Sequence, residues 1–150
     1  MVEIIPAIQK DVDWVATHLR DADRNEAMAL GGRDPEDVVQ ISYEQAEKSY
    51  IGLYEDEPFI VFGVSHFQDE VGCVWLVGTD KIHDARVGFL RVSHYWLNDL
   101  HENYPLLFNY VDARNTLHIR WLRWLGFTFI NLHPEFGAGR LPFYEIVRIR

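Results

Sequence analysis

The chain has 150 residues, of which 48% are apolar, 25% charged and 14% aromatic. These proportions are typical of a folded globular domain and exclude a disordered chain, so we expect a single domain spanning residues 1–150. The net charge of −9 disfavours nucleic acid and anionic membranes as general partners. The single cysteine, Cys73, excludes an intramolecular disulfide and a cysteine-based zinc site.

Targeting signals and common catalytic motifs are not found in the sequence. No apolar run is long enough to span a membrane, and the first residues lead into strand-like sequence without a signal peptide. A phosphate-binding glycine loop, a serine-hydrolase elbow and a histidine-based metal motif are missing, so we expect no metal site. We therefore expect a cytoplasmic protein, in the host cell if a phage encodes it, with packaging into the virion as an alternative.

The first third of the chain predicts one strand followed by helices. Residues 2–7 are typical of a short strand. Asp11 is expected to cap a helix that extends to Ala22, since apolar residues recur there at helical spacing. Pro35, after a glycine-rich break, suits the first turn of another helix, and Ser42 with Gln45 predicts a capping box for a helix through Lys48.

The middle of the chain predicts three consecutive strands and a long helix. The strands are expected over residues 49–54, 59–67 and 71–77. These stretches contain β-branched residues, and turns with acidic residues separate them. This pattern indicates an antiparallel meander. Residues 84–103 then show helical spacing of apolar residues.

The last third alternates strands with a short helix. We expect strands over 106–112, 127–131 and 141–148, with a helix over 116–125 and a loop over 134–139. The whole order of elements predicts an α/β fold with a mixed central sheet and helices on both of its faces.

The segment VDARNTLHIRWLRWLGF, residues 111–127, carries a motif. Asn115 precedes the short helix, and Gly126 follows it where a left-handed residue is favoured. The distance from Asn115 to the pair Gly126-Phe127, together with the order of elements, resembles the GCN5-related N-acetyltransferase (GNAT) family. The resemblance covers nearly the whole chain and implies the GNAT-like acyl-CoA N-acyltransferase fold.

A second resemblance is more specific. Residues 111–127 and the stretch DVDWVATHLRDADRNE, residues 11–26, resemble a family of bacteriophage proteins similar to the internal virion protein A of short-tailed phages. Such proteins are described as having a GNAT-like fold. The resemblance implies a phage or host protein as a partner.

The GNAT resemblance implies acetyl-CoA as the cofactor, bound where the fourth and fifth strands separate. Its pyrophosphate would lie on backbone N–H groups at the start of the following helix, which attracts anions. The implied cofactor-binding residues are Val77, Gly78, Ala85, Arg86, Val87, Gly88 and Asn115. The loop departs from the family pattern, since alanine and valine occupy its glycine positions and isoleucine its basic position. A helix cap explains Asn115 more simply than a cofactor contact.

Catalytic groups are also incomplete relative to the GNAT family. The family's usual tyrosine position is Leu122 here. The candidates for a general base are His66, Glu70 and Asp80, which lie on or beside the third and fourth strands. Two functions therefore remain. One is a CoA-dependent N-acetyltransferase acting on a small-molecule or protein amine, and the alternative is an inactive GNAT scaffold in virion assembly or host interaction.

Arginines cluster in the second half of the sequence. Arg86 and Arg91 lie in the long helix, and Arg114, Arg120 and Arg123 lie in and before the short one. In an acidic chain this clustering still leaves room for a local basic patch that binds one small polyanion.

Overall fold

The computed structural model of residues 1–150 contains seven strands and five helices. Their bounds are β1 Val2–Pro6, α1 Gln9–Thr17, α2 Asp21–Gly31, α3 Pro35–Gln45, β2 Ala46–Tyr54, β3 Glu57–Gln68, β4 Val71–Gly78, α4 Ile82–Leu100, β5 Leu106–Asp112, α5 Thr116–Trp124, β6 Thr128–Phe136 and β7 Leu141–Ile149. None of the helices has the combination of length and apolar character that a membrane crossing requires.

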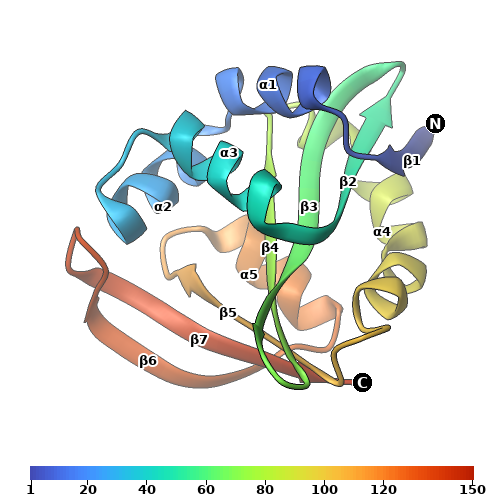
Figure 1. Cartoon of the computed structure of the whole chain (residues 1–150). Coiled ribbons are helices and arrows are strands. Elements are labelled where there is room, and N and C mark those ends of the chain that lie inside the picture. The colour runs from blue at the N-terminus through green and yellow to red at the C-terminus, as the bar shows by residue number, and fades with distance from the viewer.

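All seven strands belong to one sheet with the order β1-β2-β3-β4-β5-β7-β6 (Figure 1). Neighbouring strands are antiparallel except β4 and β5, which are parallel and are connected through α4. A parallel pair requires such a crossover, whereas β2, β3 and β4 follow one another through tight turns. The expected mixed sheet is confirmed.

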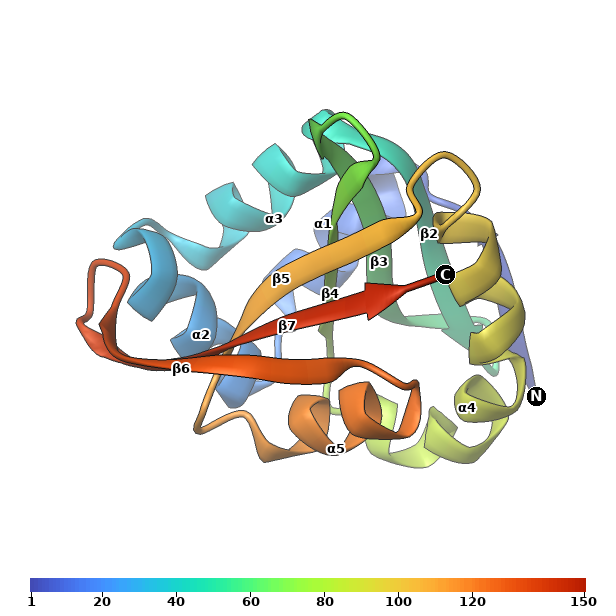
Figure 2. The ribbon, with the colours of Figure 1, turned by 90° about the horizontal axis from the view of Figure 1, so that it is seen from below.

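Helices cover both faces of this sheet (Figure 2). Successive side chains of a strand point to opposite faces, and β3 shows this directly. Val61 packs in a smaller core with α1 and α3, while its neighbours Ile60 and Phe62 pack in a larger core with α4 and α5. The two groups of helices therefore lie on opposite faces of the sheet.

The division between α1 and α2 corrects the sequence interpretation, which placed one helix from Asp11 to Ala22. α1 begins before Asp11, which lies in its first turn and does not cap it. Between the helices, Leu19 forms an isolated antiparallel bridge with Thr79, so long-range pairing interrupts the helical pattern. α2 is then capped by Gly32, whose φ of 66° is the left-handed conformation that glycine favours.

Two other elements differ from expectation. Pro35 does begin α3, with Asp34 capping the Glu36 amide, but the helix ends at Gln45 and β2 starts at once. The expected capping box at Ser42 is wrong because the Ser42 hydroxyl donates back to Val38 O within the helix. β6 extends through Pro134, which is tolerated because the β6–β7 register shifts there and β6 is an edge strand.

The β6–β7 turn is attached to the end of α2. The amides of Ala138 and Gly139 donate to the carbonyls of Leu30 and Ala29 at 3.1 and 2.8 Å. Gly137 has a φ of 71°, and a Cβ added there would lie 2.6 Å from Ala29 O. Glycine is therefore required at this contact, which fixes α2 beside the second half of the sheet.

Candidate functional site

The parallel strands β4 and β5 separate soon after they begin. They pair only at Val71 with Leu106, Gly72 with Leu107 and Cys73 with Phe108. Beyond these positions the side chain of Asn109 spans the gap, and its Nδ2 donates to Val74 O at 2.5 Å. The strands thus form a wedge that opens toward the end of β4.

A mostly apolar cavity of about 100 Å³ lies in this wedge. Its walls come from β4, β5, α4 and α5, and include Trp75, Trp96, Tyr110 and Trp121. For comparison, an engineered protein cavity of about 150 Å³ accepts benzene. The cavity is therefore large enough only for a small ligand or for one end of a larger one.

Few polar groups face this cavity. The Trp75 indole N–H and His118 Nε2 are buried without a hydrogen-bond partner. Glu26 of α2 also lines the cavity, and its carboxylate accepts the Asp112 amide at 2.8 Å. Burial, followed by the charges of Asp23 and Asp112, raises the pKa of Glu26 to about 8, against the lowering effect of that hydrogen bond. Glu26 is therefore a carboxyl group that can exchange a proton near neutral pH.

A buried polar cluster centred on Asp23 closes the wide end of the wedge. The Asp23 carboxylate accepts hydrogen bonds from Arg20 Nη1 at 3.1 Å, Asn115 Nδ2 at 2.9 Å and the Gly78 amide at 2.8 Å. His118 Nε2 lies 3.3 Å from Asp23 Oδ1 but outside hydrogen-bond geometry. Arg20 compensates the buried negative charge, so the cluster is held together by charge-assisted hydrogen bonds.

Asn115 and His118 belong to this cluster. Asn115 occupies the N-cap position of α5, yet its side chain makes no capping hydrogen bond and donates to Asp23 instead. Its Oδ1 has no partner. Burial lowers the pKa of His118, Asp23 opposes that shift and Arg20 adds to it, which keeps the imidazole neutral. The predicted residue Asn115 therefore lies at the site, in a different role from a helix cap.

The start of α4 holds most of the other predicted cofactor-binding residues. The amides of Ile82 and His83 donate to Thr79 O and Asp80 O at 3.1 and 3.2 Å, and those of Asp84 and Ala85 both donate to Lys81 O. These amides form part of a continuous turn. The helix therefore presents no row of free N–H groups to an anion at its first turn.

The remaining residues of this junction mostly serve packing. Val77 is half-buried against the smaller core, and Ala85 is buried in the larger one. A Cβ added at Gly88 would lie 2.8 Å from Val2 Cγ2, so this glycine lets α4 approach β1. Arg86 and Val87 are exposed on the outer side of α4.

The three predicted general bases do not lie together. His66 pairs with Gly72 near the start of β4, and Glu70 lies in the turn just before that strand. Asp80 follows the other end of β4. The two ends of this strand are about 23 Å apart at the usual rise per residue. His66 and Glu70 line an open polar depression instead, where His66 Nδ1 lies 3.3 Å from the Tyr104 hydroxyl.

Sequence reasoning missed Asp23 and Glu26. A usable signal was present, since Arg20, Asp23 and Ala27 share one helical stripe and Ala27 is buried. A charged pair on the apolar stripe of a helix indicates a buried, partnered group. Glu26 gains its importance from contacts with β5, 86 positions away, which the pattern of α2 alone does not reveal.

Solved structures with the same fold include several N-acetyltransferases. The chain matches the ribosomal-protein-alanine N-acetyltransferase of Brucella melitensis with a TM-score of 0.73 and 16% identity, covering 99% of both chains. A GCN5-related N-acetyltransferase of Kribbella flavida gives 0.73 and 15%, over 99% and 98%. A GNAT acetyltransferase of Elizabethkingia anophelis with acetyl-CoA bound gives 0.66 and 10%, over 99% and 98%. At such identities the likeness shows the fold alone, which is the GNAT fold.

The sequence itself identifies a phage family. Residues 61–136, just over half of the chain, match the family model described as Bacteriophage T7, probable scaffold protein Gp13. The chain therefore belongs to that family. No curated protein matches the sequence.

Proposed function

We propose that this chain is a phage assembly protein that uses the GNAT fold as a scaffold and does not hold acetyl-CoA at the start of α4. The observation that carries this proposal is the internal use of the amides from Ile82 to Ala85. The Gly78 amide is also occupied, by the Asp23 carboxylate. A pyrophosphate needs such amides free, so this junction does not fit the cofactor.

Local charge supports the same conclusion. Asp80 and Asp84 are exposed at the start of α4, where they are favoured by the helix dipole and would repel pyrophosphate. Lys81 lies 5.9 Å from the centre of the Tyr54 ring, so its ammonium group has a partner within the chain. The partial positive charge at the N-terminus of α4 is thus already balanced by the carboxylates of Asp80 and Asp84.

The family description supports the assembly role. The matching family is described by the words "probable scaffold protein" of bacteriophage T7, and the match runs from within β3 to the end of β6. The internal virion protein A resemblance of residues 11–26 and 111–127 points the same way. We propose a phage protein or a host protein as the partner, and the host cytoplasm as the place where they meet.

Cofactor binding is tested by thermal unfolding with acetyl-CoA and CoA up to about 1 mM, the upper end of usual KM values. A ligand of the native state at a hundredfold excess over its Kd adds about 2.7 kcal/mol to the free energy of unfolding. We expect no rise in melting temperature. Any rise in melting temperature contradicts the proposal. If that rise disappears in Arg86→Glu but persists in the matched charge reversal Arg140→Glu, the cofactor binds at α4.

The assembly role is tested separately, with a tagged copy expressed during phage infection. We expect the protein to co-sediment with immature capsid shells, and Glu26→Gln to leave this unchanged because no catalytic carboxyl group is needed. Protein that stays at the top of the gradient throughout infection would refute the assembly role.

A second candidate function is acyl transfer to an amine, with the donor bound in the wedge by a route other than the α4 junction. Glu26 favours it, because a carboxyl group with a pKa near 8 beside a cavity can accept a proton from an amine. His66, Glu70 and Asp80 stay as alternative bases. A radiolabelled acetyl-CoA assay with each carboxyl group changed to its amide, and His66 changed to alanine, distinguishes them. Loss of turnover in Glu26→Gln alone would support this candidate over the assembly protein.

A further inference from the structure

Four arginines lie exposed on the two helices that cover the larger core. They are Arg86 and Arg91 of α4 and Arg120 and Arg123 of α5, and we call them the basic surface. None of them forms an ion pair within the chain. One exposed carboxylate, Asp84, lies on the same helices. Arg123 stacks on the Phe129 ring, 4.2 Å from its centre. No carboxylate of the chain pairs with any of the four, so the basic surface carries positive charge without a counter-charge in a chain of net charge −9.

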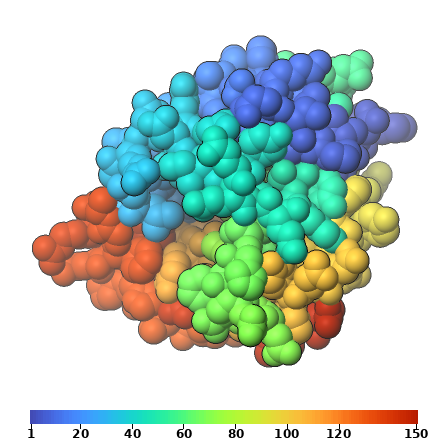
Figure 3. Space-filling view, in the orientation of Figure 1, coloured from blue at the N-terminus to red at the C-terminus, as the bar shows by residue number.

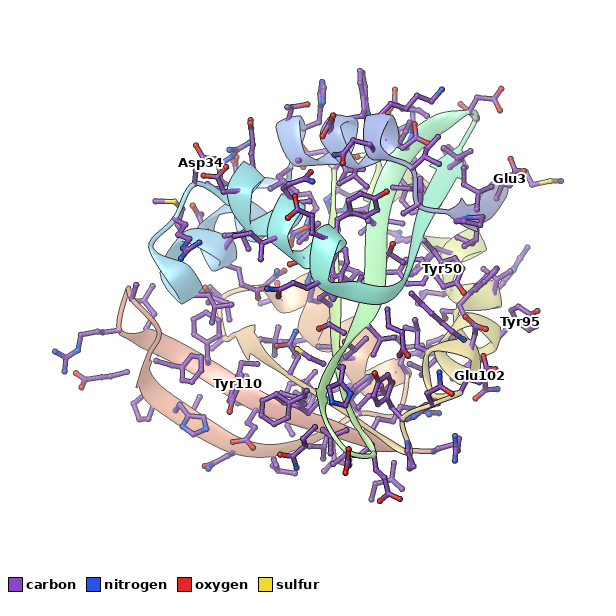
Figure 4. All side chains as sticks on the ribbon, viewed as in Figure 1. Glu3, Asp34, Tyr50, Tyr95, Glu102 and Tyr110 are labelled. Atoms are coloured by element: carbon purple, nitrogen blue, oxygen red, sulfur yellow. The ribbon has the colours of Figure 1, made fainter.

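Exposed apolar side chains accompany these arginines. Val87 and Tyr95 of α4 are 56% and 70% exposed, and Trp124 of α5 is 51% exposed. Tyr95 projects outward from α4 (Figure 4). The rings of His94 and Trp124 lie 4.7 Å apart, so α4 and α5 are in contact through exposed aromatic side chains. Arginine and large aromatic residues together are the composition of a protein–protein interface.

The opposite face of the sheet carries the opposite charge. Helices α1 and α3, the cap of α3, and α2 beside α3 expose the carboxylates of Asp13, Asp21, Asp34, Glu36, Asp37 and Glu44, which we call the acidic face. They expose only Lys10 and Arg33 as basic groups. In Figure 3 the atoms of these helices, blue to cyan, make one continuous surface. Trp14, 40% exposed, offers an aromatic contact there.

We propose that the basic surface of one copy docks on the acidic face of a second copy, head to tail. The two surfaces lie on opposite faces of the sheet, so each copy can engage one neighbour through each face (Figure 2). A contact between different surfaces is heterologous, and it produces rings or open filaments instead of closed dimers. This inference does not depend on whether the chain binds acetyl-CoA.

Charge distribution favours a second copy over nucleic acid as the occupant. Residues 1–80 contain 17 acidic and 5 basic residues, whereas residues 81–150 contain 6 acidic and 9 basic ones. A long polyanion at the basic surface would also be exposed to the field of the remaining acidic chain. A second copy, in contrast, brings only the carboxylates of its acidic face against the arginines.

The size of the molecule is sufficient for such a contact. A standard interface buries about 800 Å² per partner, about a tenth of the surface of a small protein. The accessible surface of this chain is 7881 Å², so one contact of standard size buries about a tenth of it. Exposed ion pairs contribute little each and are screened by salt, so the association is weak and salt-sensitive.

The first test is sedimentation velocity of the full chain over a range of protein concentrations. At about 0.1 M salt, where the Debye length is about 10 Å, we expect the average sedimentation coefficient to rise with concentration. At about 1 M salt, where it is about 3 Å, we expect monomer. Arg120→Glu should lower the association constant roughly threefold to fivefold, which corresponds to less than about 1 kcal/mol. Arg140→Glu, with the same change in net charge but in the β6–β7 turn outside α4 and α5, should leave it unchanged.

The second test identifies the complementary surface. Arg91→Glu with Arg120→Glu removes the basic surface, and Asp37→Lys with Glu44→Lys removes the acidic face at two positions on one side of α3. Each double variant alone should remain monomeric with an unchanged circular dichroism spectrum. Their mixture should form dimers only, because each retains one intact surface.

Three outcomes would overturn the proposal. A wild-type chain that stays monomeric at all concentrations would exclude self-association. Assembly that resists both double variants would place the contact on another surface. A wild-type chain that stays monomeric but binds a fluorescent oligonucleotide, with loss on Arg120→Glu, would assign the basic surface to nucleic acid.

Discussion

The Asp23 carboxylate accepts the backbone N–H of Gly78 at 2.8 Å, although the two residues are 55 positions apart in the sequence. The Arg20 amide donates to Gly78 O at 2.9 Å, so the start of α2 is attached to the last residue of β4 by both its backbone and its side chain. This attachment closes the wide end of the wedge between β4 and β5. It also places a carboxylate where the loop toward α4 begins.

Replacement of Asp23 by alanine should therefore destabilise the fold strongly. The substitution leaves the Arg20 guanidinium uncompensated and the donors of Asn115 and Gly78 without an acceptor, all of them buried. Loss of one partner of a buried ion pair typically costs about 3–5 kcal/mol. Urea unfolding followed by circular dichroism measures this cost. Asp21→Ala, exposed in the first turn of the same helix, should cost less than about 1 kcal/mol through the helix dipole, and equal effects of the two would exclude a structural role for the cluster.

Glu26 should make stability fall as the pH rises. Burial raises its pKa from the ordinary value of 4.5 to about 8 in the folded chain. Between these values the folded chain holds a proton that the unfolded chain has released, so the free energy of unfolding decreases with pH. The effect of Glu26 is absent below pH 4.5, where both states are protonated, and complete above pH 8.

The comparison that isolates this effect is Glu26→Gln against the wild type. We expect the variant to gain up to a few kcal/mol relative to the wild type between about pH 5 and pH 8, since a tenfold change in a proton-binding constant corresponds to about 1.36 kcal/mol. Chemical denaturation at several pH values measures the difference, in which the other titrating groups largely cancel. Glu44→Gln, at an exposed position of α3, should show no such trend. A parallel pH dependence in all three chains would assign the titration to another group.

Gly88 should behave as a packing residue and not as a cofactor-binding residue. An alanine Cβ there would lie 2.8 Å from Val2 Cγ2, a stiff β-branched side chain, so Gly88→Ala should cost about 1–3 kcal/mol through overpacking. With Val2→Ala the clash is removed, and the same change should then stabilise α4 by up to about 1 kcal/mol because alanine favours a helix. Thermal unfolding of the four chains of this cycle provides the coupling energy. Additive effects would contradict the contact.

The sequence predicted those elements whose signals are local. Asn115, the apolar stripe of α5 and Gly126 bound a short helix, and the structure has that helix with Gly126 at a φ of 90°. The three-strand meander and β5 were found in the same way, because turn residues and β-branched runs act over a few positions. The element order that these signals produce was sufficient for the fold class.

Elements and site residues that depend on distant contacts were not predictable. The break between α1 and α2 arises from pairing of Leu19 with Thr79, and no breaker residue marks it in the sequence. Asn115 was found at the right place but with the wrong interaction, since its partner Asp23 lies 92 positions away. The raised pKa of Glu26 likewise results from burial by other elements of the fold, and the residue pattern of α2 does not reveal that burial.

Asn109 should control how far the wedge opens. Its Nδ2 donates to Val74 O, and its Oδ1 accepts the Tyr110 amide, so one side chain joins β5 to β4 just past their last paired residues. Asn109→Leu removes both bonds and keeps a similar volume. We expect a loss of about 1–2 kcal/mol in stability, together with faster amide exchange in the second half of β4, because only this side chain bridges the strands there.

Amide hydrogen exchange followed by mass spectrometry locates the change. Protection should fall in a peptide covering 74–78, while a peptide from the β5–β7 pair, which has its own ladder of partners, should stay unchanged. Asn131→Leu, on the edge strand β6, is the matched control and should leave both peptides protected. Uniform loss of protection in Asn109→Leu would indicate global destabilisation, whereas unchanged exchange in 74–78 would show that the walls of the wedge are held apart by α4 and α5 without this bridge.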